Sequence, residues 1–187
     1  MRQNNMRVIF IADIHHAFAQ VERLLEETDA DLYLVTGDLV SRAFFRYATA
    51  WRFMELQQAM AGFRTRENLD ETSDLAAQRI LKSGKGHPQF SQAEEYIALS
   101  RKAEEYLKKS YDRLERIFAS YPEKKIYVLP GNYDMDLRQT SLGHRDIHLK
   151  CIESDGQRVA GLGGADVMTP GMPDHLQIPY GKGKLVF

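Results

Sequence analysis

Three short apolar runs along the chain have the pattern of buried β-strands, at residues 7–12, 32–36 and 125–129. Each run is rich in β-branched or aromatic side chains and is bounded by polar residues or glycine. Between the first two runs, residues 17–28 place apolar side chains three or four positions apart, which is typical of an amphipathic helix. Strand, helix and strand in this order predict a βαβ unit with parallel strands.

The pattern changes in residues 42–121, which carry no strand signal and are predicted to be helical. Residues 44–63 have a helical pattern with many aromatic side chains, and glycines and a proline at 84–88 interrupt the segment. Ser91 and Glu94 form a capping-box pattern that predicts the start of a long helix. The apolar stripe of that helix has the spacing of one helical face and comprises Tyr96, Ala103, Leu107, Tyr111, Leu114, Phe118 and Tyr121.

Two features of this helical segment allow alternative interpretations. The apolar stripe is compatible with a dimer seam, although packing against other helices of the same chain is more economical. The aromatic side chains between Phe44 and Phe63 are compatible with a cap over a substrate site, but we favour helix packing for them as well.

Two further strands are predicted at residues 147–153 and 158–162, joined by a turn at Asp155-Gly156. A glycine-rich bend follows the second of these strands. The C-terminal tail contains prolines and several glycines, so we predict that it is a loop.

Composition and charge narrow the class of protein. The chain has 187 residues, 43% of them hydrophobic, which suits one domain with a sizeable core. Its net charge of -1 gives no indication of nucleic-acid binding, but it is compatible with a phosphorylated substrate if bound metal ions supply positive charge.

Cys151 is the one cysteine, and in a predicted strand it is better interpreted as a small buried side chain than as a nucleophile. We expect a cytoplasmic protein without a membrane span, because no disulfide can form within the chain and the first apolar run is short.

Polar side chains of metal-binding type follow each of the three predicted parallel strands. Asp13 and His15 follow the first strand, Asp38 the second and Asn132 the third. Ligands bind outside the carboxyl ends of parallel strands, so one edge of the sheet would bring these groups together. On an extended chain, Asp13 and His15 would face the same side and grip one cation. Asp38 has two oxygens with which to bridge two cations, and Asn132 would offer an amide oxygen to the second.

Imidazole, carboxylate and amide ligands suit Mn, Fe or Zn, and two such ions roughly 3.5–4 Å apart can clamp a phosphoryl group and activate a water. The glycines before Asp38 and Asn132 would let the chain turn sharply where the side chains converge. His16 is a candidate for contacting phosphate or, equally, a polar residue at the start of a helix. Asp134 is a candidate for supporting the metal ligands or an ordinary turn residue. No catalytic acid or base is assigned.

The motifs that follow the three strands resemble the first three motifs of the calcineurin-like metallophosphoesterase family. The resemblance covers residues 7–38 and 125–166, and the helical segment between them, residues 42–121, has the character of an insertion. The motifs are Asp13-x-His15, Gly37-Asp38 and Gly131-Asn132-Tyr133-Asp134.

The resemblance implies an α/β fold, a partial αββα sandwich with a helical insertion. It also implies metal-dependent hydrolysis of a phosphate mono- or diester by two divalent metal ions. By the same resemblance, Asp13 and His15 would bind the first ion and Asp38 would bridge the two. Asn132 would bind the second ion.

The sequence departs from the family pattern in two places, and these departures leave alternative interpretations of its function open. Tyr133 stands where the family often has a histidine, and the later Gly-His-x-His motif is absent. We therefore interpret residues 1–187 as one C-terminally incomplete domain, and His144, His148 and His175 as surface or core residues rather than replacement ligands. The alternatives are a non-catalytic binding module or inactive fragment, and a half-site completed by a homodimer partner or by a missing C-terminal half.

Overall fold

A computed structural model describes residues 6–164 and 169–178 of the chain. It contains helices and strands in an order that begins with a βαβ unit and continues into a run of three helices. The elements are β1 (Val8–Ile11), α1 (Phe18–Glu27), β2 (Leu32–Thr36), α2 (Tyr47–Arg66), α3 (Ser73–Lys82), α4 (Phe90–Ala119), β3 (Ile126–Leu129), the 3-10 helix η1 (Leu137–Gln139), β4 (Cys151–Ser154), β5 (Gln157–Ala160) and the 3-10 helix η2 (Asp174–Leu176).

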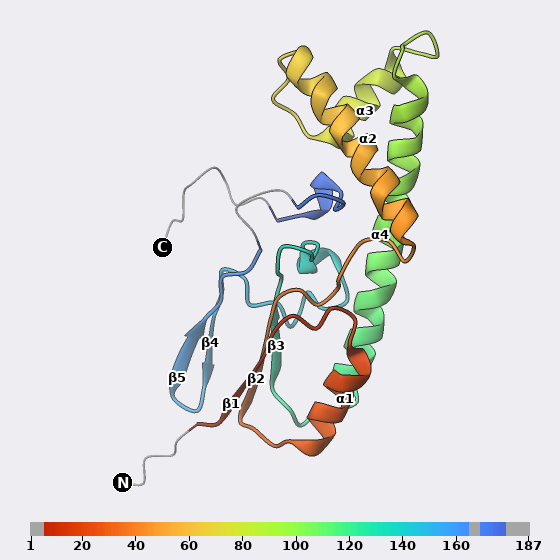
Figure 1. Ribbon diagram of the computed structural model, residues 1–187. Helices are drawn as coiled ribbons and strands as arrows, with labels where there is room; N and C mark the ends of the chain where they lie inside the picture. Colours follow the sequence, from red (N-terminus) through yellow and green to blue (C-terminus); the bar gives the residue numbers. More distant parts are fainter. Residues whose placement is uncertain (1–5, 165–168, 179–187) are drawn as a thin grey trace.

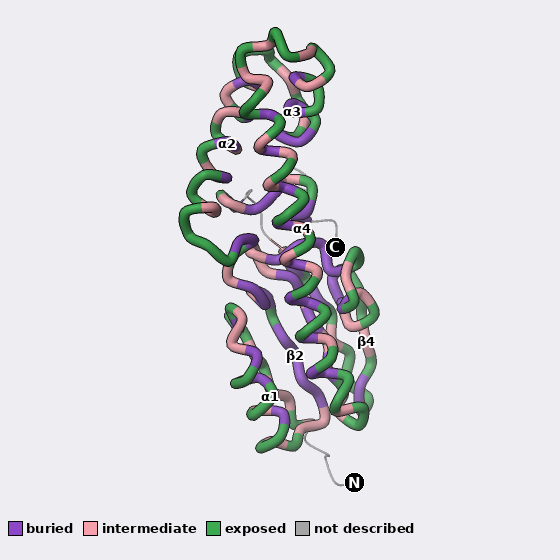
Figure 2. Tube along the Cα trace, turned by 90° about the vertical axis from the view of Figure 1, so that its right-hand side faces the viewer, coloured by how far each residue is buried: buried purple, intermediate pink, exposed green. Residues whose placement is uncertain are grey.

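The central sheet has the order β1-β2-β3, and both pairs of strands are parallel. Leu32 to Val35 in β2 are buried on both faces of the sheet, which is visible as the purple trace of this strand in Figure 2. Such two-sided burial explains why the strand is a continuous apolar run rather than an alternating one. The parallel βαβ unit predicted from the sequence is therefore confirmed.

Helices and a hairpin cover opposite faces of this sheet (Figure 1). On one face, α1 and the C-terminal half of α4 pack on the sheet around a large apolar core. On the other face, Leu32, Leu34 and Ile147 form a smaller buried cluster, against which Ile152 and Val159 of the β4-β5 hairpin pack. The result is a layer of helices, a parallel sheet and a second β layer, as expected for a partial αββα sandwich.

The helices α2 and α3 pack against each other and against the N-terminal half of α4, and they project beyond the sheet (Figure 1). Because α4 has 30 residues, it is roughly 45 Å long and belongs to both parts of the molecule. Its apolar stripe is buried within the chain, so the interpretation as a dimer seam is wrong. The fully buried members of the stripe are Tyr96, Ala103, Leu107, Tyr111, Leu114 and Phe118.

The aromatic side chains near α2 divide into two groups. Phe44, Phe53 and Phe63 are buried in the core, which confirms helix packing for them. The helix α2 begins and ends a few residues later than the helix predicted at residues 44–63, so Phe44 lies in the loop before it. The exposed aromatic side chains are Phe45, Tyr47 and Trp51.

Two details of the sequence interpretation are wrong. Cys151 is exposed, because it lies on the outward face of the β4-β5 hairpin rather than against the sheet. The capping box at Ser91 and Glu94 does not form, because α4 already begins at Phe90 and Ser91 lies inside its first turn. Gln89 precedes the helix without a side-chain capping hydrogen bond.

A side-chain cap begins α3, and a tight turn closes the β4-β5 hairpin. Thr72 caps α3 by accepting a hydrogen bond from the backbone N–H of Leu75 at 3.3 Å, a signal that the sequence interpretation did not use. The turn at Asp155-Gly156 joins β4 to β5 as predicted, with positive φ at both residues. Residues 165–168 and 179–187, which include part of the predicted C-terminal loop, lie outside the described residues. No helix of the described part is both long and apolar enough to cross a membrane.

Candidate metal centre

The segments that follow β1 and β2 leave the sheet side by side in an unusual backbone conformation. Asp13, His15 and Asp38 have positive φ angles of 53°, 44° and 50°, which are uncommon and strained outside glycine. The backbone N–H of Asp13 donates to the carbonyl of Gly37 at 3.2 Å, and that of His15 donates to the carbonyl of Asp38 at 2.9 Å. The convergence of Asp13 and His15 therefore comes from left-handed turns, and the predicted extended chain is wrong.

Three of the four predicted metal ligands form one group. Donor atoms of Asp13, His15 and Asp38 all lie within 4.8 Å of one another. His15 Nε2 lies 3.6 Å from a carboxylate oxygen of Asp13, and its Nδ1 faces the backbone carbonyl of Val40 at 3.4 Å. A hydrogen bond from Nδ1 to that carbonyl leaves the lone pair on Nε2, the arrangement that metal-binding histidines commonly use.

Asn132, the fourth predicted ligand, lies directly against Asp38. Its side-chain nitrogen donates to the hydroxyl of Thr169 at 3.3 Å. In this orientation the amide oxygen faces the two carboxylate oxygens of Asp38 at 3.2 and 3.3 Å. The flipped amide would instead donate to both Asp38 oxygens and accept from the Thr169 hydroxyl at 3.3 Å, so a cation beside Asp38 would favour the orientation with the oxygen towards it. Two carboxylates, an imidazole and an amide that can turn its oxygen towards them form a donor set that fits a divalent metal ion.

Two glycines allow the loops after β2 and β3 to touch. A Cβ atom on Gly37, whose φ is 86°, would lie 2.8 Å from Gly131 Cα. A Cβ atom on Gly131 would overlap the carboxylate and the backbone nitrogen of Asp38. The prediction of a sharp turn holds for Gly37, whereas Gly131 is needed because the two chains approach so closely.

Asp134 forms hydrogen bonds with both of these loops. Its buried carboxylate accepts hydrogen bonds from the backbone N–H of Leu39 at 3.1 Å and of Gly131 at 2.8 Å, and from the Tyr111 hydroxyl at 3.1 Å. Burial raises the pKa of the Asp134 carboxyl to about 6, although these donors oppose the shift. Asp134 thus connects the loops that carry Asp38 and Asn132 with helix α4, which is more than an ordinary turn residue does.

His16 and Tyr133 border the group. Both ring nitrogens of His16 face protein hydroxyls, Nδ1 that of Ser41 at 3.1 Å and Nε2 that of Ser110 at 3.3 Å. Burial and nearby Arg42 lower the pKa of His16. Its predicted contact with phosphate stays a prediction. The ring of Tyr133 lies edge-on to His15 with 6.3 Å between the ring centroids, so Tyr133 is at the rim of the candidate site.

The other histidines lie apart from this group. His144 is exposed beside Glu115, and His175 contacts Asp74 at 3.0 Å. His148 is buried, where its Nδ1 accepts from the backbone N–H of Gly163 at 3.0 Å. Within residues 6–164 and 169–178, the group of Asp13, His15 and Asp38 is the one set of three acidic or histidine side chains close enough to hold a single ion.

Two residues at the site were not predicted from the sequence. Tyr111 belongs to the apolar stripe of α4, where its hydroxyl gave no separate signal. Thr169 lies in the predicted C-terminal loop, and its approach to Asn132 depends on the whole fold. Neither residue has a local pattern that could have identified it.

Comparison with known proteins agrees with this geometry. The profile of the calcineurin-like phosphoesterase family matches residues 6–169. The chain belongs to this family. Comparison with curated proteins and with solved structures found no match. Membership of the calcineurin-like phosphoesterases makes the chain a member of a hydrolase family that binds divalent metals, and the Asp13, His15 and Asp38 group is a possible site for them.

Proposed function

We propose that this chain hydrolyses phosphate mono- or diesters with two divalent metal ions held by Asp13, His15, Asp38 and Asn132. The observation that carries the proposal is the convergence of three donor atoms within 4.8 Å at the carboxyl edge of the parallel sheet. It occurs in a chain that belongs to the calcineurin-like phosphoesterases. Mn, Fe and Zn are the ions that suit these ligands best.

Each residue would have its own role. Asp13 and His15 would hold the first ion and Asn132 the second, and Asp38, which lies close to all three, would bridge both. When bound, the ions would neutralise charge on the phosphoryl group and lower the pKa of a water. The side chains of Asp13 and His15 are 70% and 41% exposed, so a substrate can reach them from solvent.

Hydrolysis of chromogenic phosphate mono- and diesters with and without Mn²⁺ tests this proposal. We expect turnover that depends on Mn²⁺ and that falls by roughly 100-fold or more in Asp38→Asn. That factor corresponds to a loss of about 2.7 kcal/mol of transition-state stabilisation. Asp112→Asn, an exposed change on α4, is the matched control and should retain turnover. A folded native chain that shows no turnover at any Mn²⁺ concentration would contradict the proposal.

A non-catalytic binding module is the second candidate. The observation in its favour is that Tyr133, in place of the histidine common in the family, lies beside His15. Metal stoichiometry separates the two candidates. A hydrolase should bind two Mn²⁺ ions per chain in calorimetric titration, whereas a binding module with a degenerate site should bind one ion weakly or none.

A further inference from the structure

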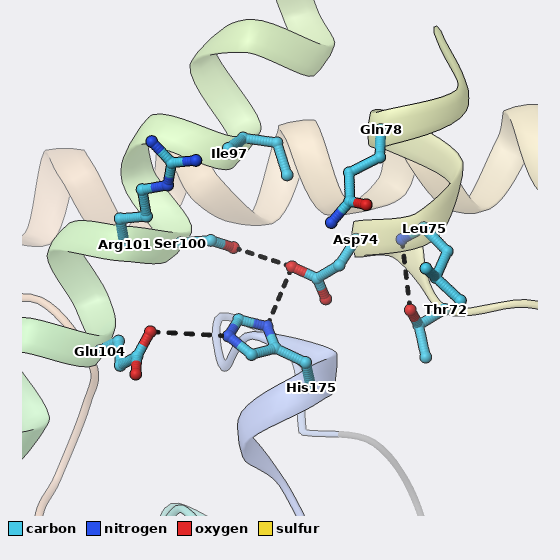
Figure 3. Close-up of a pocket in the computed structure, with 9 residues that line it drawn as sticks. All are labelled: Thr72, Asp74, Leu75, Gln78, Ile97, Ser100, Arg101, Glu104 and His175. Carbon is cyan, nitrogen blue, oxygen red and sulfur yellow. Dashed lines mark hydrogen bonds and ion pairs between the residues drawn. The ribbon is translucent and has the colours of Figure 1, made fainter. Parts of the chain in front are cut away.

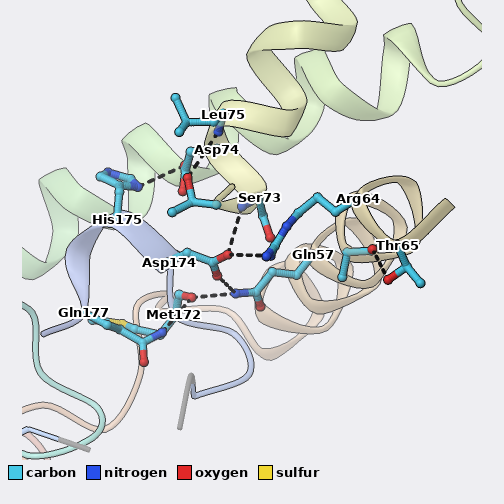
Figure 4. Close-up of polar contacts among 12 residues, drawn as sticks. Gln57, Arg64, Thr65, Ser73, Asp74, Leu75, Met172, Asp174, His175 and Gln177 are labelled. Carbon is cyan, nitrogen blue, oxygen red and sulfur yellow. Dashed lines mark hydrogen bonds and ion pairs between the residues drawn. The ribbon is translucent and has the colours of Figure 1, made fainter. Parts of the chain in front are cut away.

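Residues 169–178, which we call the docking segment, lie between the metal centre and the helices α2 and α3. Leu176 is fully buried in the main core, and its carbonyl accepts a hydrogen bond from the backbone N–H of Asp136 at 2.8 Å. Figure 4 shows that other residues of the segment make polar contacts with helical residues far away in the sequence. The docking segment thus contacts both parts of the molecule.

At one end of the docking segment, Thr169 touches the candidate metal ligand Asn132. The Thr169 side chain is buried, and its hydroxyl accepts a hydrogen bond from the Asn132 side-chain nitrogen at 3.3 Å. The hydroxyl can also donate to the amide oxygen of the flipped side chain at 3.3 Å, so Thr169 holds the Asn132 side chain in either orientation. When the amide oxygen binds a cation, the amide nitrogen points at Thr169, and without the hydroxyl it would have no acceptor there.

The position of Thr169 is itself fixed by the buried side chain of Gln177. The Gln177 amide oxygen accepts from the backbone N–H of Thr169 at 2.8 Å, and its nitrogen donates to the Thr169 carbonyl at 3.3 Å. The same nitrogen donates to the carbonyl of Met172 at 3.2 Å. These bonds close the docking segment into a compact loop, so that Thr169 moves only if the whole segment moves.

Gln57 of α2 holds this loop from the helical side (Figure 4). Its nitrogen donates to the carbonyl of Met172 at 2.6 Å and to the Asp174 carboxylate at 3.0 Å, and its oxygen accepts from the backbone N–H of Gly171 at 2.9 Å. Asp174 also accepts from the backbone N–H of Ser73, at the start of α3, at 3.0 Å. Two helices outside the sheet therefore fix the segment.

His175 adds a contact with α3 and α4. Its ring lies in a hollow between these helices (Figure 3). Nδ1 lies 3.0 Å from Asp74, and Nε2 lies 3.9 Å from Glu104. Asp74 accepts a further hydrogen bond from Ser100 at 3.4 Å. The three helices of the segment 42–121 thus all contribute to the surface on which the docking segment rests.

We propose that Thr169 is a positioning residue for the metal ligand Asn132, and that α2–α4 set the affinity of the second metal position through the docking segment. The inference rests on the proposed function, because it assumes that Asn132 binds an ion. It assigns a role to helices that carry none of the predicted ligands.

Calorimetric titration of the full chain with Mn²⁺ tests the role of Thr169. Thr169→Val keeps the shape of the side chain but removes the acceptor, and it should weaken the second Mn²⁺ by roughly 10–100-fold, the cost usual for losing a partner of a metal ligand. Thr169→Ser restores the hydroxyl and should recover most of the affinity. A folded Thr169→Val chain, checked by circular dichroism, with native affinity for both ions would overturn the proposal.

Gln57→Leu tests the role of the helices, because it removes three hydrogen bonds to the docking segment without touching the metal centre. We expect the second Mn²⁺ to bind more weakly, in the same direction as in Thr169→Val. An unchanged dissociation constant would overturn the role assigned to α2–α4. If the native chain binds no Mn²⁺, the proposed function fails as well. If the native chain binds two ions and the variants do not differ from it, this inference alone fails.

Discussion

At the residue scale, the candidate metal centre concentrates backbone strain and tight contacts. Asp13, His15, His16 and Asp38 all adopt positive φ angles within two neighbouring loops. Such conformations cost of order 1–3 kcal/mol each and persist where the surrounding structure enforces them. Here the carboxylate of Asp134 and the backbone hydrogen bonds between the loops supply that enforcement. Strain at this one edge of the sheet supports its interpretation as a functional site.

Gly131→Ala should disrupt this edge selectively. Its Cβ atom would overlap the carboxylate and the backbone nitrogen of Asp38, so the two loops must separate. Overpacking of this kind typically costs about 1–3 kcal/mol of unfolding free energy, and Mn²⁺ binding should be lost with it. Urea unfolding and calorimetric titration measure both effects. Gly86→Ala is the control, because a Cβ atom there meets open space; equal stability of the two variants would contradict the prediction.

The convergence of Asp13, His15 and Asp38 was predictable from the sequence, because these residues follow neighbouring strands and parallel strands end at one edge. The contacts that hold the candidate ligands were not. Tyr111 lies 23 positions from Asp134, and Thr169 lies 37 positions from Asn132. Pairs so far apart meet only when the fold is complete, and no local spacing indicates them. The left-handed backbone at Asp13 was missed because it arises from pairing with Gly37.

At the scale of elements, α4 contacts both the candidate metal centre and the docking segment. Its Tyr111 hydroxyl donates to Asp134 and accepts from the backbone N–H of Met135, both at 3.1 Å. About two turns towards its N-terminus, Glu104 lies 3.9 Å from His175 of the docking segment, and Ser100 donates to Asp74, which contacts the same histidine. One helix therefore contacts both the loops of the candidate metal centre and His175 of the docking segment.

The contact of His175 predicts a dependence of stability on pH. The hydrogen bond to Asp74, together with the charges of Asp74, Glu104 and Asp174, raises the pKa of His175 above its usual value. A raised pKa means that the folded state binds the proton more tightly. The stabilisation is therefore complete below the unfolded value of about 6.5 and is lost as pH rises through the folded pKa. Arg101 lines the same hollow.

Thermal unfolding of the native chain and of His175→Gln at several pH values measures this effect. The side chain of His175 is partly exposed, so solvent screening limits the pair to about 1 kcal/mol or less, which corresponds to roughly 2–4 °C in Tm. The stabilisation of the native chain over the variant should be present at pH 6 and should shrink towards pH 9. His144→Gln, the same chemical change far from the docking segment, is the control. A Tm difference that does not change with pH would show that His175 does not titrate there.

The parallel strands and the long helix were predictable, because each strand is a short apolar run and the apolar side chains of the helix recur at helical spacing. The start of α4 was not, since Ser91 and Glu94 have the spacing of a capping box but lie inside the first turn. Cys151 was misplaced because burial in a two-stranded hairpin depends on which face meets the sheet, and a one-residue change reverses it.

At the scale of the whole molecule, the second β layer covers the sheet unevenly. The β4-β5 hairpin packs over Leu32 and Leu34 of β2, whereas Phe10 of β1 is 69% exposed. Among the described strands, β1 has a neighbour on one side only. An exposed edge that carries a large apolar side chain is a template for pairing with another chain.

We therefore expect the chain to self-associate through β1 as its concentration rises. Phe10→Lys places a charge beside this edge and should shift the weight-average mass in sedimentation velocity towards the monomer, because charged side chains, lysine above all, protect natural edge strands from pairing. Phe45→Lys is the matched control, since Phe45 is equally exposed but lies in the loop before α2. If both substitutions reduce association equally, general surface hydrophobicity is the cause. If the native chain stays monomeric at every concentration, the edge of β1 is protected in solution and the prediction is wrong.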